Sequence, residues 1–185
     1  SSRPMNRILN PLSKMGLKAV SNDGKLPIRI YRSDLNGIHY DSPVASAQIK
    51  STLLLAGLGS NGETSVTEPI LSRDHTERML KWLGVKLSTN GFSSTISPLT
   101  SPLSAFELAI PGDPSTAAFF AATAAIVPGS NLTLNRILQN PTRIGFYDSL
   151  NKMGVGMTCV ETWEDAGEII GKLNVSHHSL NGINI

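Results

Sequence analysis

Apolar residues recur along this chain in three similar stretches, each headed by an arginine and closed by a glycine. The arginines stand 70 residues apart, at Arg3, Arg73 and Arg143. Within each stretch the apolar positions fall three or four residues apart, the spacing that puts them on one face of a helix. A glycine is the usual residue just beyond a helix end. The pattern therefore predicts amphipathic helices within residues 3–16, 73–84 and 143–154.

Two further stretches are apolar almost all round and recur with nearly the same spacing. One begins at Ser46, and the other begins at Ser115, 69 residues later. A helix without a polar face needs neighbours on every side. We therefore expect two interior helices that are buried all round.

Short alternating or β-branched segments between these helices predict strands. Turn residues such as Asn22-Asp23-Gly24 and Asn90-Gly91 separate some of them. The strands are expected at 17–20, 28–31, 64–67, 85–87, 94–96, 131–135 and 155–160, with another where the given sequence ends, at Ile185.

One module of about 70 residues accounts for this order of elements and recurs roughly two and a half times. It runs helix, strands, apolar helix, strand. Placing the apolar helices inside and the sheets outside gives an α/β fold with inverted layering, which needs several copies to complete a core. We expect that fold to be incomplete in this chain, and the chain to be a piece of a longer protein.

Composition narrows the classes of protein that remain. The hydrophobic content is 40% and the net charge is +2, with basic residues scattered, so neither nucleic acid nor a membrane surface is an expected partner. No apolar run reaches the roughly 20 residues of a membrane span, and no secretory signal is recognisable. A cytoplasmic location is expected. The single Cys159 excludes an internal disulfide and is expected to be a buried structural thiol.

Several local motifs have ordinary structural interpretations. Residues 57–62 read G-x-G-x-x-G, but a helix precedes them and a strand follows, which reverses the order of the dinucleotide-binding fingerprint and predicts a plain turn. His177-His178 lacks Cys or Glu at ligand spacing and predicts a solvated turn. Asp74 favours a helix start. No Ser/His/Asp arrangement is visible, and no metal or cofactor is expected.

The arginine heads are the strongest candidates for binding. A helix start offers free N–H groups and a partial positive charge, which suit phosphate or carboxylate. If the repeated helices run parallel, Ser46, Ala47 and Gln48 share one end of the bundle with Arg3 and Arg73. The alternative is that Ser46 is only a helix cap and the arginines are only solvated charges. Three other arginines are expected at the surface: Arg7, Arg78 and Arg136.

Five segments, in order along nearly the whole chain, carry a family resemblance: RPMNRILNPL from Arg3, PVASAQIKSTLLLAGL from Pro43, EPILSRDHTERML from Glu68, PGDPSTAAF from Pro111 and NPTRIG from Asn140. Together they resemble the middle part of the 5-enolpyruvylshikimate-3-phosphate synthases (3-phosphoshikimate 1-carboxyvinyltransferases), in particular the bacterial class II form. The resemblance covers all 185 residues but somewhat under half of a typical member.

The resemblance implies two similar domains, each an inside-out α/β barrel of three βαβαββ units with helices inside. The crossover between domains would lie near Ile110 to Asp113. Residues 1–110 would then be the later part of the first enolpyruvyl transferase domain, and residues 111–185 the start of the second. A hinge role for Asp113 is one further expectation.

The resemblance also implies an activity. The family transfers the carboxyvinyl group of phosphoenolpyruvate to the 5-hydroxyl of shikimate 3-phosphate and releases phosphate, a step of the shikimate pathway to aromatic amino acids. Both substrates are anionic, so a cationic, hydroxyl-lined cleft is expected, with no cofactor. The family's proton-transfer residues lie outside this chain. No catalytic residue is therefore expected here, and the chain should be inactive without the remainder of the same enzyme.

Residue by residue, the resemblance places Arg3 against phosphoenolpyruvate. Ser46 and the backbone N–H of Ala47 match the groups that hold the phosphate of shikimate 3-phosphate, and Gln48 matches the residue beside its ring. Arg73 matches a further contact to that substrate. Many relatives have serine in place of Ala47, so only the main-chain contact carries over. The third arginine head matches no site residue and is expected to be structural.

Two other functions remain open. The sister transferase that acts on UDP-N-acetylglucosamine shares the fold, but a cysteine in a mobile loop usually marks it, and Cys159 lies in a different context. A non-catalytic, repeat-built binding domain is the second. Stabilisation by shikimate 3-phosphate would separate the synthase from such a binding domain, because a ligand specific to the folded state raises the melting temperature.

Overall fold

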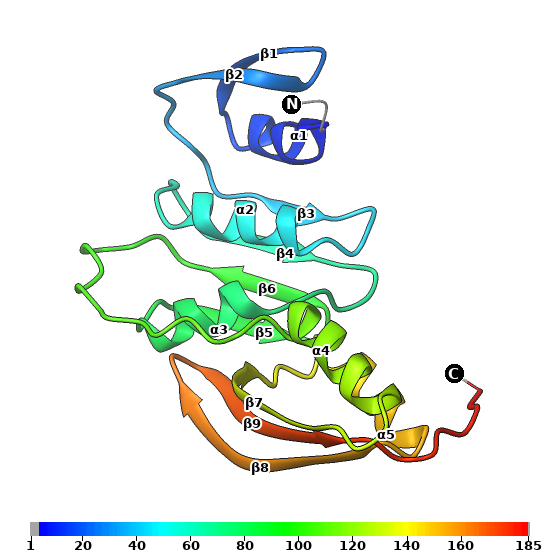
Figure 1. Cartoon of the computed structure of the whole chain (residues 1–185). Helices are drawn as coiled ribbons and strands as arrows, with labels where there is room; N and C mark the ends of the chain where they lie inside the picture. The colour runs from blue at the N-terminus through cyan, green and yellow to red at the C-terminus, as the bar shows by residue number, and fades with distance from the viewer. Residues whose placement is uncertain (1–3, 185) are drawn as a thin grey trace. The chain divides into compact units, whose positions relative to one another are not determined.

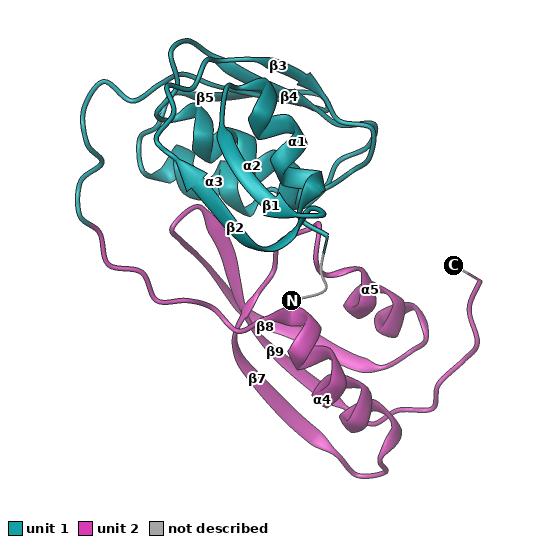
Figure 2. Ribbon diagram, turned by 90° about the horizontal axis from the view of Figure 1, so that it is seen from above, with its two compact units in different colours: residues 1–105 teal, residues 106–185 magenta. Residues whose placement is uncertain are grey.

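The computed structural model describes residues 4–184, in two compact units that comprise residues 1–105 and 106–185 (Figure 2). The expected crossover at Ile110 to Asp113 falls a few residues inside unit 2, and its assignment to the boundary between the two family domains stays a prediction.

Unit 1 opens with a helix and a hairpin. Helix α1 (Asn6–Lys14) leads into strands β1 (Lys18–Asn22) and β2 (Lys25–Tyr31), which pair antiparallel (Figure 1). The two loop residues, Asp23 and Gly24, have φ angles of 48° and 67°. Two consecutive positive φ angles are what a two-residue hairpin turn of the favoured hand requires, and Asp-Gly supplies them.

A four-stranded sheet follows in unit 1, in the order β3-β4-β6-β5. Its strands are β3 (His39–Asp41), β4 (Thr64–Thr67), β5 (Leu87–Asn90) and β6 (Ser93–Ile96). Strands β3 and β4 are parallel, and the other pairs are antiparallel. Helix α2 (Ala47–Gly57) connects β3 to β4, and α3 (His75–Trp82) connects β4 to β5. This order of elements is a complete βαβαββ module.

Unit 2 repeats most of the same module. Its elements are α4 (Pro114–Ile126), β7 (Asn131–Leu138), α5 (Gly145–Lys152), β8 (Gly156–Asp165) and β9 (Glu168–Ser176). The sheet order β7-β9-β8 reproduces β4-β6-β5 of unit 1. An isolated parallel bridge between Gly112 and Ile137 takes the place of the β3–β4 pair. The recurrence predicted from the arginine spacing is therefore a structural repeat.

Helix α2 packs on two sides within unit 1. One core cluster joins it to α1 and β4 through Met15, Ile49, Leu53 and Val66. A second joins it to α3 and β6 through Leu54, Leu80, Val85 and Ile96. Strands β4 and β6 thus turn one face toward the helices, as the inside-helix layering requires, although no closed barrel forms within residues 4–184.

Burial on every side is not reached, and that expectation is wrong for this chain. In α4 the side chains of Phe119 and Phe120 are 77% and 60% exposed, and in α2 Leu55 is 50% exposed. The physical reason is that α4 has core neighbours on its alanine side only, where Ala117, Ala121, Ala124 and Ala125 pack against β7, α5 and β9.

The predicted helices and internal strands are confirmed, with boundaries that differ by a few residues. Strands β3 and β9 were not predicted, and the strand expected at the end of the sequence is not formed over residues 177–184. Cys159 is exposed rather than buried. It lies on the edge strand β8 beside a register shift, which turns its sulfur toward the carbonyl of Glu161. No helix within residues 4–184 has the length and apolar content to cross a membrane.

Candidate functional site

The start of α2 presents two open hydrogen-bond donors. Ser46 is the N-cap residue, in an extended conformation, and its Oγ accepts the N–H of Ile49 at 3.4 Å. Among the described residues, the N–H groups of Ala47 and Gln48 have no hydrogen-bond partner. Free N–H groups and the positive end of the helix dipole favour an anion at this place.

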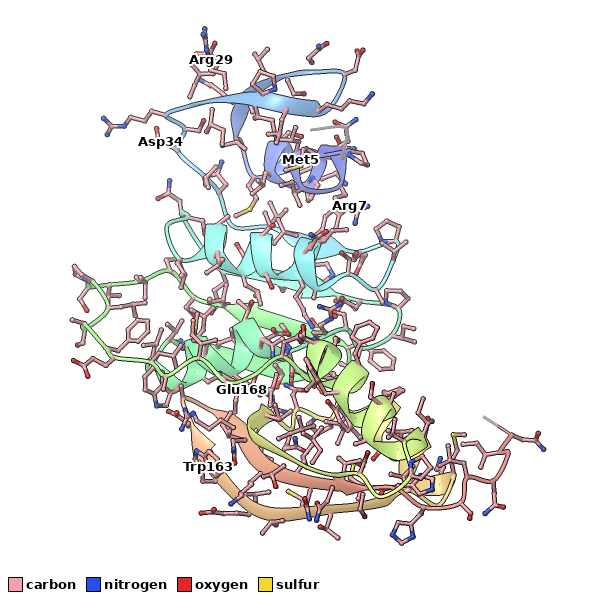
Figure 3. The ribbon with its side chains drawn as sticks, in the orientation of Figure 1. Met5, Arg7, Arg29, Asp34, Trp163 and Glu168 are labelled. Atoms are coloured by element: carbon pink, nitrogen blue, oxygen red, sulfur yellow. The ribbon has the colours of Figure 1, made fainter. Side chains whose placement is uncertain are left out.

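Arg7 joins the start of α1 to the start of α2. Its Nη1 donates a hydrogen bond to Oε1 of Gln48 at 3.1 Å. The side chain was predicted only to be at the surface, and it is exposed, but it lies in a groove of about 600 Å³ between the two helices. Figure 3 shows Met5 and Arg7 at this end of α1. The groove is lined by Pro4, Met5, Arg7, Ile8, Gln48, Ser51, Thr52 and Leu55.

The carboxylate of Glu68 brings the start of α2 next to the segment that carries Arg73. Its Oε1 accepts the N–H of Ser46 at 2.9 Å, and its Oε2 accepts the N–H of Ser72 at 3.3 Å. Ser72 directly precedes Arg73, whose side chain is exposed and forms no ion pair with an acid in residues 4–184. The predicted neighbours Ser46 and Arg73 therefore start their helices at the same end of unit 1.

A second contact fixes α2 against α3. The hydroxyl groups of Ser51 and Thr76 lie 2.6 Å apart, within the first two turns of the two helices. Asp74, expected to favour the start of α3, makes no side-chain cap but pairs with Nε of Arg78 at 2.8 Å. Arg3 lies outside the described residues, so its predicted place at this end is not part of the structure. Its neighbour Pro4 lines the groove.

A buried charged cluster lies beneath this end of unit 1. Lys50 of α2 is 2% exposed, and its Nζ lies 2.8 Å from a carboxylate oxygen of Glu68 and 2.8 Å from one of Glu77. Burial is the largest single influence on the pKa of Lys50 and lowers it, but the hydrogen bonds and charges of both glutamates outweigh burial and raise that pKa. The pKa of Glu68 is lowered in the same way, against burial, by Lys50 and the N–H of Ser46. Both groups are therefore held charged.

The corresponding helix start in unit 2 is occupied by the protein's own carboxylate. Asp113 caps α4 by accepting the N–H groups of Ser115 and Thr116 at 3.2 and 3.1 Å. Arg143 lies 2.5 Å from the Asp113 carboxylate and donates to Oγ of Ser115 at 2.9 Å. The hydroxyl of Thr116 makes the largest contribution to lowering the pKa of Asp113. These contacts give the third arginine head a structural role, as expected.

The other sequence motifs form ordinary structure. Residues 57–62 are the turn from α2 to β4, as predicted, and a ring nitrogen of His177 lies 2.9 Å from the carbonyl oxygen of Ala125. No group of three or more His, Cys, Asp or Glu side chains that could hold a metal ion occurs in the described part of the chain.

One arrangement was missed by sequence reading. Nδ1 of His39 lies 2.6 Å from Oγ of Ser65, and its Nε2 lies 3.1 Å from Asp41. These side chains meet because His39 and Ser65 are direct partners in the parallel β3–β4 register. The His39 and Asp41 side chains are 59% and 77% exposed, and the N–H of Ser65 is already bonded to the carbonyl of Ile38. Acyl transfer needs donors aimed at an oxyanion in a water-excluded place, and this open sheet face does not provide one.

Comparison with known proteins agrees with the repeat and the resemblance. The family described as EPSP synthase (3-phosphoshikimate 1-carboxyvinyltransferase) matches residues 1–185. The 3-phosphoshikimate 1-carboxyvinyltransferases of Ruthia magnifica and Maricaulis maris are 46% and 43% identical to the chain, which is covered completely in both cases. The chain spans 42% of the length of each of these relatives.

The solved structure of EPSP synthase from Acinetobacter baumannii superposes on the whole chain with a TM-score of 0.89 and 41% identity, and the chain covers 42% of it. The repeated α/β module is therefore that of the enolpyruvyl transferase fold. The chain belongs to the EPSP synthase (3-phosphoshikimate 1-carboxyvinyltransferase) family.

Proposed function

We propose that this chain is the part of a 3-phosphoshikimate 1-carboxyvinyltransferase that binds shikimate 3-phosphate at the start of α2. The complete enzyme would transfer the carboxyvinyl group of phosphoenolpyruvate to that substrate and release phosphate, a step toward the aromatic amino acids. The observation that carries the proposal is the pair of open N–H groups at Ala47 and Gln48, with Arg73 held at the same end of the unit.

The chemistry of the helix start suits a phosphate. The hydroxyl of Ser46 accepts from Ile49 and still has its own proton to donate, and Ala47 adds a backbone donor. Arg73 supplies the charge, through the planar donor fork that matches phosphate. Each charge-assisted hydrogen bond contributes about 1.5 to 3 kcal/mol. Gln48, oriented by Arg7, is the proposed contact beside the ring, and Arg3 the proposed contact to phosphoenolpyruvate.

Proton transfer is proposed to depend on the remainder of the enzyme. The two buried carboxylates nearest the site, Glu68 and Glu77, both face Lys50 at 2.8 Å and are engaged there. A general acid or base must reach the reacting atoms. The 185-residue chain alone should therefore bind shikimate 3-phosphate without releasing phosphate from phosphoenolpyruvate. A cytoplasmic location is part of the same proposal.

The direct test is Arg73→Ala in the complete enzyme. We expect KM for shikimate 3-phosphate to rise by about tenfold or more with a smaller change in kcat, because binding common to ground and transition states is lost. Arg78→Ala is the matched control, since Arg78 lies in α3, five residues after Arg73, but pairs with Asp74. An unchanged KM in Arg73→Ala would remove Arg73 from the site.

Ligand-induced stabilisation distinguishes the alternatives. Shikimate 3-phosphate should raise the melting temperature of the chain, because it binds the folded state. A rise with UDP-N-acetylglucosamine alone would instead support the sister transferase. Indifference to both ligands would support a non-catalytic binding domain.

A further inference from the structure

Glu68 occupies an unusual position for a charged residue. It follows the last residue of β4 and is only 2% exposed. Each of its carboxylate oxygens accepts a backbone N–H from a different segment: Oε1 from Ser46, at 2.9 Å, and Oε2 from Ser72, at 3.3 Å. One segment begins α2, and the other leads into α3.

Lys50 orients this carboxylate. Its Nζ lies 2.8 Å from Oε2 of Glu68 and 2.8 Å from Oε1 of Glu77. The three residues are 2 to 4% exposed, so none of their side chains can turn outward without leaving buried charge unpaired. A buried ion pair contributes little to stability compared with an apolar core of the same volume, but it can select one arrangement among several.

We propose that Glu68 is a positioning residue that sets the distance between the two substrate-binding segments of unit 1, the start of α2 and the segment of Ser72 and Arg73. The inference rests on the proposed function, because it assigns those segments to one ligand. Two N–H groups that share a single carboxylate cannot drift apart without losing a hydrogen bond. Ala47 and Arg73 are then preset for the same anion, which lowers the ordering cost of binding.

Glu68→Gln is the informative variant, and Glu77→Gln is its matched control. Glutamine keeps the shape of Glu68 but can turn only one oxygen toward these groups. Its amide nitrogen is a donor and must face another donor, either Lys50 or an N–H. Glu77 belongs to the same buried cluster and bonds the same Lys50, but its bonded partners are Lys50 and Ser94, away from both segments.

In the complete enzyme we expect both variants to be destabilised, while only Glu68→Gln raises KM for shikimate 3-phosphate, by about tenfold, at nearly unchanged kcat. Equal KM values in the two variants would overturn the positioning role. If wild-type enzyme shows no saturation by shikimate 3-phosphate, the proposed function itself fails, which is a distinguishable result.

A measurement on the unmodified chain covers the case in which Glu68→Gln does not fold. The amide protons of Ser46 and Ser72 should exchange slowly with solvent and should lose protection together as Glu68 is protonated at acid pH. Rapid exchange of either amide at neutral pH would contradict the shared carboxylate. Glu68→Asp, whose side chain is one methylene shorter, should satisfy only one of the two amides and show an intermediate KM.

Discussion

The guanidinium of Arg143 lies 2.5 Å from the carboxylate of Asp113, at the start of α4. That carboxylate also accepts the N–H groups of Ser115 and Thr116. In unit 1 the equivalent helix, α2, starts with open N–H groups, and its Arg73 is not paired with an acid in the described residues. In unit 2 the carboxylate of Asp113 therefore occupies the anion position at the helix start. In unit 1 the equivalent position at the start of α2 is open.

Asp113→Ala should lower the unfolding free energy of unit 2 by about 1 kcal/mol, because it removes a helix cap. Loss of the ion pair with Arg143, whose side chain is 16% exposed, should add to that cost. Trp163 is the only tryptophan of unit 2 and Trp82 the only one of unit 1. Urea unfolding followed by Trp163 fluorescence in a Trp82→Phe background reports on unit 2. Glu164→Ala, at an exposed position of β8, is the control and should change stability by no more than about 0.5 kcal/mol.

Gly57→Ala should destabilise unit 1 by about 1 to 3 kcal/mol through overpacking. A Cβ at Gly57 would lie 2.7 Å from Cγ2 of Ile96 and 3.0 Å from Cβ of Thr64, where α2 meets the sheet. Gly59, two residues on, has nothing within 4 Å of its ideal Cβ, so Gly59→Ala is the matched control. Urea unfolding followed by Trp82 fluorescence in a Trp163→Phe background measures the stability of both variants. Equal stabilities of the two variants would show that the helix does not approach the sheet this closely.

The buried cluster predicts the pH dependence of stability. The pKa of Glu68 is lowered from its ordinary 4.5, so its contribution is present above that value and is lost as pH falls through the folded-state pKa. The pKa of Lys50 is raised from 10.5, so its contribution is present below that value and is lost as pH rises through the folded-state pKa. The unfolding free energy measured with urea should be nearly constant at pH values between these two limits. The stability difference between wild type and Glu68→Gln should shrink as Glu68 becomes protonated at acid pH, and a constant difference would argue against the ion pair.

Tyr147 predicts a separate effect at alkaline pH. Burial, helped by the charge of Asp113, raises the pKa of Tyr147 to about 12, and its hydroxyl donates to the carbonyl of Pro114 at 2.7 Å. A raised pKa stabilises the fold below the unfolded value of 10.0, and this contribution is lost as pH rises to about 12. Tyr147→Phe should remove the component of the ultraviolet titration near pH 12 and cost about 1 kcal/mol of stability at neutral pH. Persistence of that component would assign it to another tyrosine.

Periodicity was enough to predict the repeat, since helix faces and glycine ends are local signals. Strand β3 escaped because His39–Asp41 is three residues long and mostly polar, so it carries no clear alternation. Strand β9 contains Gly171 and Lys172, which weaken the usual strand signal.

The site was only partly predictable, because its connections are not local. Ser46 as a cap and Arg73 as a helix head could be inferred from the sequence. Glu68 bonds the backbone N–H groups of Ser46 and Ser72, which lie 22 and 4 residues from it in the sequence. No periodicity indicates that this glutamate is buried together with a lysine. Arg7 was placed at the surface because nothing in the sequence links it to Gln48, 41 residues on. The exposed Cys159 follows from a register shift that only the pairing of β8 and β9 determines.

The central claim is that the start of α2 receives the phosphate of shikimate 3-phosphate. The most direct test is a titration of the isotope-labelled 185-residue chain with that ligand, followed through its backbone amide resonances. We predict saturable shifts at Ala47 and Gln48 and none at Ser115 or Thr116, where Asp113 already takes the donors. Unchanged Ala47 and Gln48 resonances at saturating ligand, or equal shifts at both helix starts, would contradict the account.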